Sequence, residues 1–480
     1  MTGREGLRVP ARAPYICRMS HPGEHQPVAV SDTPGWRLFL EFFADAARRG
    51  LPLVPLRPRG RDPATALSGG DFDFLMPSDA FPLLVELLWQ RAAAEGASFS
   101  INRTNPHKLQ AFIHVPEAGR SIQLELWTRL EVRDPARRSA RWIPWSAVAP
   151  LLATGDDGLP RLPLEIEIAC YLSHLATRRK RVETPLVAER IAAYAALAAA
   201  AAPRLAPLLA GLTSAGIPGA AVAANARLRE LGVLESRTPL TAALDTIRER
   251  VSALPWKWDR RLRRAARIIA VTGADGVGKS TVVARWGASL RGGLKVQRFK
   301  NLFRHHPAYR LYYHVRLAAA RRRGGGQVPR NAFDEIHAAV MFDFARASWT
   351  WFRLLALMGG RRCLDRGFPD LLFGGLRGDG PAGLRPDWLD LAARMPQPDW
   401  HVHLDAPDAV ILGRKQELSV DGLRAYRDGM ARIVGAAPAD AFSRIDTGRS
   451  IEEVEACLRM AAVCHGVRLP WTEATAASRR

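Results

Sequence analysis

The chain has 480 residues, a length that usually divides into two or three domains because a single hydrophobic core rarely grows so large. Its 48% hydrophobic and 24% charged residues are typical of a globular protein. The formal net charge is +22, yet seven of the 69 basic residues are Lys, which leaves 62 Arg spread from end to end. This dispersion argues against a nucleic-acid partner. Enzymes that handle phosphate are also basic, so a high net charge is compatible with such an enzyme.

The first 33 residues are polar and contain no apolar segment, so they predict a disordered leader without a signal peptide, and translation starts at Met1 or Met19. The five cysteines show no C-x-x-C spacing, which favours reduced thiols in a cytoplasmic protein over disulfides or a zinc site. Ile191–Leu212 is apolar but is interrupted by Pro and Arg, so no membrane span is expected. The sequence leaves open whether the chain forms a homodimer.

Residues 34–184 predict an α+β domain, because short apolar runs with strand character alternate with helical periodicity. The expected strands are Leu51–Leu56, Phe72–Met76, Gln110–His114 and Ile122–Trp127, and the expected helices are Phe81–Glu95 and Leu164–Thr177.

Three acidic residues in this domain point to metal chemistry. Asp71 and Asp73 are two positions apart on an expected strand, so both side chains point to the same face. Glu125 belongs to another expected strand that could lie beside it. Three converging carboxylates can hold one or two Mg²⁺ ions for attack on the α-phosphate of a nucleotide. The Gly pair, Asp-x-Asp and later single acid resemble the nucleotidyltransferase superfamily, with Glu where Asp is commoner; a structural strand with two exposed acids is the alternative.

Residues 185–258 are rich in Ala and Leu and predict a helical connector without chemistry of its own. From residue 259 to 480 strands and helices alternate, which predicts a parallel sheet with helices on both faces. The expected strands are Arg267–Thr272, Leu294–Phe299, Arg362–Asp365, Trp400–Leu404 and Phe442–Asp446, and the expected helices are Lys279–Leu290, Tyr309–Arg321 and Phe333–Leu357.

The segment Gly273–Ser280 matches the Walker A pattern G-x-x-x-x-G-K-[ST] between an expected strand and an expected helix. Its glycines, Gly273, Gly276 and Gly278, allow the loop to turn with positive φ and to bring backbone N–H groups close to phosphates. Lys279 is suited to the β- and γ-phosphate oxygens, and the Ser280 hydroxyl is suited to Mg²⁺. This P-loop predicts ATP and Mg²⁺ as cofactors.

The wider pattern narrows the type of P-loop protein. The loop through Thr281, with its Asp275-Gly276 pair, resembles the thymidylate kinase branch of the nucleoside-monophosphate kinases. Later segments follow in the order of that family, so that the resemblance covers residues 265–465; they are Asp365-Arg366, His401–Pro407 with Arg414-Lys415, and Ser443–Thr447 with Ile451–Val454.

The resemblance implies roles for residues around the loop. Asp365 would lie near the metal and Arg366 near the transferred phosphoryl group, while Arg414 would close over ATP from a lid. Asp275 would face the acceptor. Lys279, Arg366 and Arg414 are then the expected catalytic cations, because phosphoryl transfer depends on charge placed around the moving group.

The acceptor segment departs from the family. Arg298–Asn301 stands where thymidylate kinases carry an Arg-Glu-Pro-Gly loop, so dTMP is not supported as the substrate. The sequence therefore predicts an ATP-dependent small-molecule kinase, a transferase acting on another nucleotide, a sugar or a lipid-linked intermediate. The alternatives are a non-catalytic, ATP-binding regulatory protein and a nucleotidyltransferase that modifies nucleic acid.

Overall fold

The computed structural model describes residues 33–56, 71–105, 107–134, 139–155, 158–235, 239–252, 254, 268–289, 295–298, 306–326, single positions between 336 and 356, 362–367, 397–415, 418–436 and 441–465. Apart from Thr33, the expected leader lies outside these residues. So do the acceptor segment after Arg298 and most of the expected helix Phe333–Leu357.

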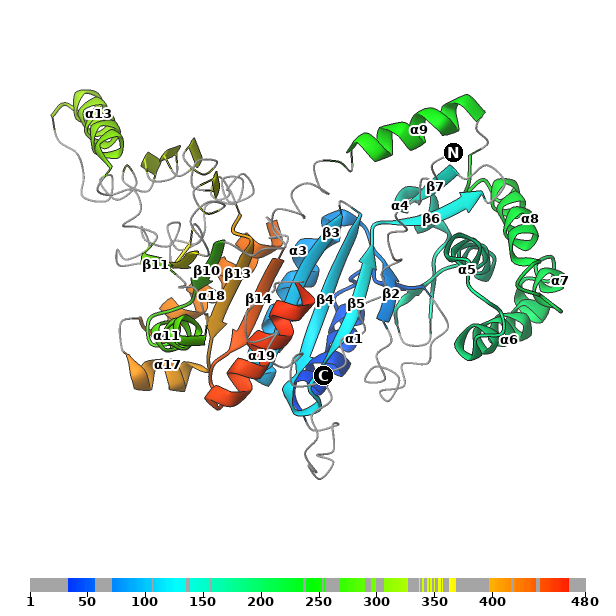
Figure 1. Ribbon diagram of the computed structural model, residues 1–480, viewed down its shortest axis with the longest axis horizontal. Helices are drawn as coiled ribbons and strands as arrows, with labels where there is room; N and C mark the ends of the chain where they lie inside the picture. Colours follow the sequence, from blue (N-terminus) through cyan, green and yellow to red (C-terminus); the bar gives the residue numbers. More distant parts are fainter. Residues whose placement is uncertain are drawn as a thin grey trace, which may run out of the picture.

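A single sheet of ten strands crosses the molecule (Figure 1), in the order β1-β2-β5-β4-β3-β14-β13-β10-β12-β11. Of its described pairings five are parallel and four are antiparallel. The protein is therefore a mixed α/β fold. The strands are β1 (Val54–Pro55), β2 (Asp71–Leu75), β3 (Ser98–Asn105), β4 (Lys108–Val115), β5 (Arg120–Trp127), β10 (Ile268–Thr272), β11 (Lys295–Arg298), β12 (Arg362–Asp365), β13 (Trp400–Asp405) and β14 (Ala441–Asp446).

Helices cover both faces of this sheet (Figure 1). Side chains of α1 (Pro34–Arg48), α3 (Phe81–Glu95) and α18 (Val420–Ala436) share one core cluster with alternate strand residues such as Ile268 and Ala270. Side chains of α11 (Lys279–Ser289) and α19 (Ile451–Cys464) pack on the opposite face with Ile269 and Val271. The alternation of buried side chains on β10 follows from the two-residue period of a strand that is covered on both sides.

The remaining elements lie beside or beyond the sheet. They are β6 (Arg129–Asp134), β7 (Ser139–Pro144), α4 (Trp145–Val148), β8 (Ala153–Thr154), β9 (Pro160–Arg161), α5 (Leu164–Arg178), α6 (Pro185–Ala201), α7 (Ala206–Leu209), α8 (Ile217–Glu230), α9 (Pro239–Ser252), α13 (Pro307–Arg323) and α17 (Asp408–Arg414), with 3-10 turns at Ser78–Ala80, Pro116–Ala118 and Ala149–Leu151.

The helices α5 to α8 share a further apolar cluster, which includes the buried residues Tyr171 and Tyr194 and also Val54 and Leu75 of the sheet. Among the described residues, no helix has the length and apolar character that a membrane span requires.

The sheet is continuous between the two ends of the chain. We call residues 33–184 the front unit and residues 268–465 the C-terminal unit. Strand β3 of the front unit pairs antiparallel with β14 of the C-terminal unit, and Ser100 lies opposite Ser443. On one side of this seam, Trp89 of α3 stacks on Phe442 with ring centroids 5.7 Å apart. The two units thus share a sheet and a core.

Candidate functional site

The P-loop leaves the carboxyl end of β10, which lies between β12 and β13 in a parallel arrangement. Gly273, Gly276 and Gly278 all have positive φ, at 141°, 94° and 96°. A Cβ atom on Gly273 would lie 2.4 Å from the carbonyl oxygen of Leu404, so this position has no room for a side chain. The sequence thus places its glycines where the turn requires them.

Lys279 is the first residue of α11 and is only 8% exposed. Its Nζ donates to the carbonyl oxygens of Gly273 and Ala274, both at 2.8 Å, and to Asp275 Oδ1 at 3.3 Å. The ammonium group is therefore folded back over the loop, with its longest contact to a carboxylate. An anion entering the loop would meet Lys279 and the N-terminus of α11 together.

Arg366 follows β12 and returns to the same loop. Its φ is 74°, unusual for a residue other than Gly, and its backbone N–H donates to the carbonyl of Val271 at 2.9 Å. Its Nη2 lies 2.8 and 2.9 Å from the two oxygens of Asp275. Asp365, the last residue of β12, pairs with Val271 beside the start of the loop. The structure therefore places Asp275, Lys279, Asp365 and Arg366 at one end of two neighbouring strands.

The end of α17 approaches the loop from another side. The Nη1 atom of Arg414 lies 3.9 Å from the position that a Cβ on Gly278 would take. The Cβ of Lys415 lies 3.1 Å from the corresponding position at Gly276. Ser280 and Thr281 are exposed in the first turn of α11. The residues expected from the sequence to bind ATP or Mg²⁺ at the P-loop, or to act on phosphate there, thus lie in or next to the segment Gly273–Thr281.

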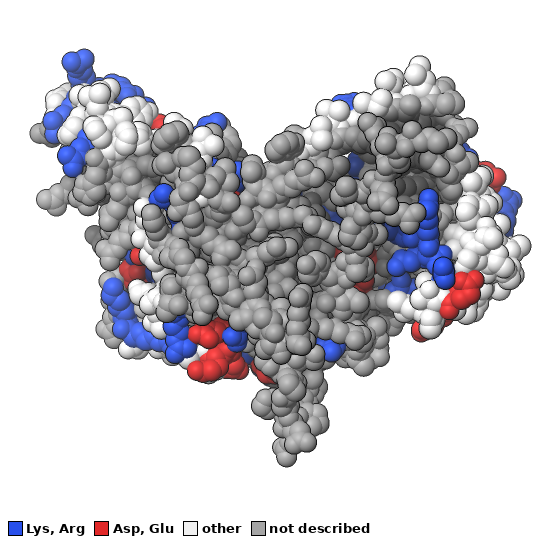
Figure 2. All heavy atoms as spheres, viewed as in Figure 1, with Lys and Arg blue, Asp and Glu red and all other residues white. Residues whose placement is uncertain are grey.

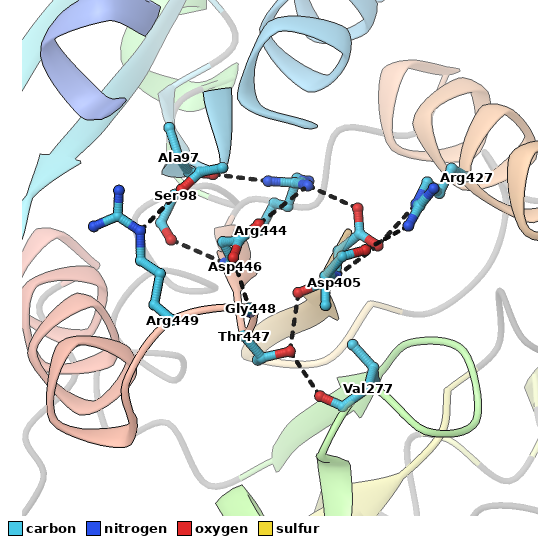
Figure 3. A network of polar contacts seen from close by, with 12 residues as sticks. Ala97, Ser98, Val277, Asp405, Arg427, Arg444, Asp446, Thr447, Gly448 and Arg449 are labelled. Atoms are coloured by element: carbon cyan, nitrogen blue, oxygen red, sulfur yellow. Dashed lines mark hydrogen bonds and ion pairs between the residues drawn. The ribbon is translucent and has the colours of Figure 1, made fainter. Parts of the chain in front are cut away.

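A buried ion-pair network lies behind the loop (Figure 3). Asp405, at the end of β13, accepts from Arg427 Nε at 2.8 Å and from Arg444 Nη2 at 2.7 Å. Burial alone would raise the pKa of Asp405, but the charges of Arg444 and Arg427 outweigh it and lower that pKa to about 2. Removing Asp405 would therefore leave the buried Arg444 without a close carboxylate partner, whereas Arg427 would keep its contact with Asp408.

The sequence alone does not reveal this network. Its members Asp405, Arg427, Arg444 and Thr447 come from separate segments, although Asp405 and Thr447 lie at or just after strand ends, where site residues collect in parallel sheets. That position is a usable signal. The pairing of Arg444 with Asp405 depends on the neighbouring positions of β13 and β14, and the spacing of the residues does not show it.

The three front acids also converge. Asp73 and Glu125 lie directly opposite each other on the parallel pair β2 and β5, as expected for neighbouring strands. One carboxylate oxygen from each, and one from Asp71, lie within 4.8 Å of one another. Glu125 also accepts from Lys108, and it accepts from Gln110 and Gln123 at 2.9 and 2.8 Å. The residues fit a divalent cation, and Lys108 supplies a positive charge at the same place.

The acid cluster and the P-loop are separate sites on the sheet. Strands β4, β3, β14 and β13 lie between β5 and β10. A shared active centre is therefore excluded in this arrangement.

Figure 2 shows where charged side chains of the described residues lie on one face of the molecule. Among the described residues, Lys and Arg gather in separate places, including the outer end of the molecule that carries α13.

Comparison with known proteins adds no assignment: no family model and no curated protein matches the chain.

Proposed function

We propose that the chain is an ATP- and Mg²⁺-dependent phosphotransferase of the thymidylate kinase-like type, whose acceptor is a small molecule other than dTMP. On this proposal the C-terminal unit is the P-loop kinase domain, and the front unit is a nucleotidyltransferase-like domain joined to it through the helical connector of residues 185–258. The observation that carries the proposal is the convergence of Lys279, Arg366 and Arg414 on a loop with three positive-φ glycines.

The charges around the loop support a phosphate ligand, because the nearby cations match an anion. A Cβ on Gly273 would lie 2.4 Å from the Leu404 carbonyl oxygen, so the backbone passes close to β13 at this point. When bound, ATP supplies the phosphoryl group and its Mg²⁺ neutralises part of the phosphate charge. Ser280 and Asp365 would hold the metal.

The residues of the chain do the rest of the work electrostatically. Lys279 would exchange its 3.3 Å contact with Asp275 for phosphate oxygens, since that contact is its longest. Arg366, now paired with Asp275, would donate to the group in transfer, and Arg414 would cover the loop. Preorganised cations stabilise the charge of the transition state more than that of the ground state.

The test is a screen of acceptors with labelled ATP. Nucleotides, sugars and lipid-linked precursors are each offered to the wild type, to Lys279→Ala and to Lys180→Ala. Lys180 is an exposed lysine after α5 and serves as the matched control. We expect transfer that depends on one acceptor class and falls at least about 100-fold in Lys279→Ala, with Lys180→Ala like the wild type. ATP binding without transfer to any acceptor would favour the non-catalytic regulatory alternative.

A second activity in the front unit is favoured by the acid cluster alone. If Asp71, Asp73 and Glu125 hold a divalent cation for nucleotidyl transfer, Mn²⁺ should bind there in a titration followed by electron paramagnetic resonance. The Asp73→Asn variant should lose that binding while retaining ATP binding at the P-loop. Equal Mn²⁺ binding by both proteins would leave the cluster as a structural ion-pair group with Lys108.

A further inference from the structure

Thr447, just after β14, contacts the P-loop directly. Its hydroxyl lies 2.7 Å from the carbonyl oxygen of Val277 and 3.0 Å from that of Asp405. Both are acceptors, so the hydroxyl proton is directed to them, and the shorter contact is to the P-loop. The backbone N–H of Thr447 donates to the same Asp405 carbonyl at 2.7 Å, which fixes the residue against the end of β13.

The contact determines how one peptide group of the loop is turned. The described chain has no cis peptide bond, so the N–H of Gly278 points away from the carbonyl of Val277. Because Thr447 holds this carbonyl on one side, the Gly278 N–H is directed to the other side. In a Walker A loop such N–H groups are the donors to phosphate.

The loop that carries Thr447 leaves little freedom. A Cβ on Gly448 would lie 2.6 Å from the Cδ of Pro407, and the Gly448 N–H donates to Asp446 Oδ1 at 2.9 Å. Thr447 is therefore placed by its two neighbours and by Asp405, and the P-loop accepts from a fixed donor.

The front unit holds this same loop through residues 96–98, the turn between α3 and β3 (Figure 3). Arg444 Nη1 donates to the Ala97 carbonyl at 2.7 Å, and Arg449 Nε donates to the Gly96 carbonyl at 3.0 Å. The backbone N–H of Asp446, next to Thr447, donates to Ser98 Oγ at 2.9 Å. Contacts from the front unit thus reach Asp446, the residue before Thr447.

We propose that Thr447 is a positioning residue of the nucleotide site and that residues 96–98 of the front unit hold it in place. The affinity of the P-loop for the ATP triphosphate then depends on a contact chain from Ser98 through Asp446 and Thr447 to Val277. This inference rests on the proposed ATP-binding function, and it assigns to the front unit a structural part in the site of the other unit.

The test measures the dissociation constants of ATP with Mg²⁺, and of inorganic tripolyphosphate, by calorimetry on the full chain. Thr447→Val removes the hydroxyl and should weaken both ligands about three- to tenfold, the effect of one lost hydrogen bond. Thr447→Ser keeps the hydroxyl and should bind within about twofold of the wild type. A parallel change for tripolyphosphate is expected because the peptide group faces phosphate and not the base.

Ser98 tests the link to the front unit. Ser98→Ala should weaken ATP about two- to threefold, and it should add nothing in the Thr447→Val background, because both changes act on one chain of contacts. The matched control is Ser450→Ala. Ser450 lies three residues after Thr447, and its side chain caps the N-terminus of α19. It should lower the melting temperature and leave the ATP dissociation constant unchanged.

The outcomes separate this inference from the proposed function. If the wild type binds ATP and Lys279→Ala does not, but Thr447→Val binds like the wild type, the inference is wrong and the proposed function stands. The inference also fails if Ser450→Ala weakens ATP as much as Thr447→Val does, since the effect would then follow stability. A wild type that binds neither ATP nor tripolyphosphate overturns both.

Discussion

Asp405 illustrates how a single charge supports the site. Its carboxylate is 4% exposed and lies between Arg427 and Arg444, of which Arg444 is 1% exposed. A buried ion pair contributes little compared with an apolar pair of the same shape, but the loss of one partner is costly because the other charge stays buried. The pKa of about 2 at Asp405 records this balance in favour of the ionised form.

Replacing Asp405 by Asn should therefore destabilise the protein strongly. We expect Asp405→Asn to lower the free energy of unfolding by about 3 kcal/mol or more, measured by urea titration at pH 7. Arg444 keeps Asp446 only at 4.0 Å, too far for full compensation. Asp408→Asn is the control, because Asp408 also contacts Arg427 but is 38% exposed, and it should cost less than about 1 kcal/mol. Equal costs would refute the buried-charge argument.

Gly273 tests the steric argument for the loop. Gly273→Ala should destabilise the protein and weaken ATP binding, because the new methyl group meets the Leu404 carbonyl and φ is 141°. We expect a cost of about 2 kcal/mol or more in thermal unfolding. Gly413→Ala is the control: its position in α17 is exposed with nothing within 4 Å, so it should stabilise by about 0.5 kcal/mol. A tolerated Gly273→Ala would contradict the closeness of this packing.

At the scale of single residues, the sequence predicts those site residues that belong to a local sequence motif. The P-loop glycines and Lys279 are recognisable because their spacing is a motif in which each residue type has its own steric or chemical reason. Thr447 is not recognisable in this way. Its partner Val277 is 170 positions away, and their contact arises only where the ends of β13 and β14 meet the loop.

At the scale of elements, the seam between β3 and β14 is polar on its α19 side. Ser100 Oγ lies 2.7 Å from Ser443 Oγ and 2.7 Å from His114 Nε2, and Ser443 Oγ lies 3.0 Å from His465 Nε2. Burial lowers the pKa of both histidines to about 3, so both are neutral in the folded protein near pH 7.

The seam should therefore make stability depend on pH. The unfolded histidines titrate near pH 6.5 and the folded ones near 3, so stability is complete above pH 6.5 and falls as the pH is lowered towards 3. Each histidine contributes a slope of up to about 1.4 kcal/mol per pH unit between these limits. Urea unfolding at pH 7.5, 6 and 5 measures this slope.

A histidine variant isolates the contribution of the seam. His465→Gln should reduce the slope between pH 6 and 5, whereas His314→Gln, at an exposed position of α13, should leave it unchanged. A slope that both variants leave intact would place the pH dependence elsewhere in the molecule.

Elements with strong local sequence patterns are predicted well from the sequence, but the strands that they pair with are not. The structure confirms the helix Phe81–Glu95 and the strand Arg362–Asp365 with the expected bounds. Strand β3 is absent from the expectations, although Ser98–Asn102 alternates polar and apolar residues as a half-buried strand does. Its pairing with β14 joins residues 343 positions apart, and no local propensity encodes such a pairing.

For the whole molecule, the sequence predicts a mixed α/β chain, and the structure confirms that class. The boundaries of the expected domains remain a prediction. What composition and motifs do not reveal is that the sheet runs through both units, because each unit by itself shows a complete strand and helix pattern. The common core also joins them, since Phe99, Trp89 and Phe442 bury their rings together across the seam.

The shared sheet and core predict that the two units unfold together. Phe99 is fully buried, and its ring centroid lies 6.2 Å from that of Phe442 in the C-terminal unit. Phe99→Ala should cost about 3–5 kcal/mol. Because the cavity opens at the seam, hydrogen exchange followed by mass spectrometry should speed up equally in peptides from β4–β5 and from β10–α11. Faster exchange in the front unit alone would mean that the units unfold independently and that the contacts across the seam add little to the P-loop.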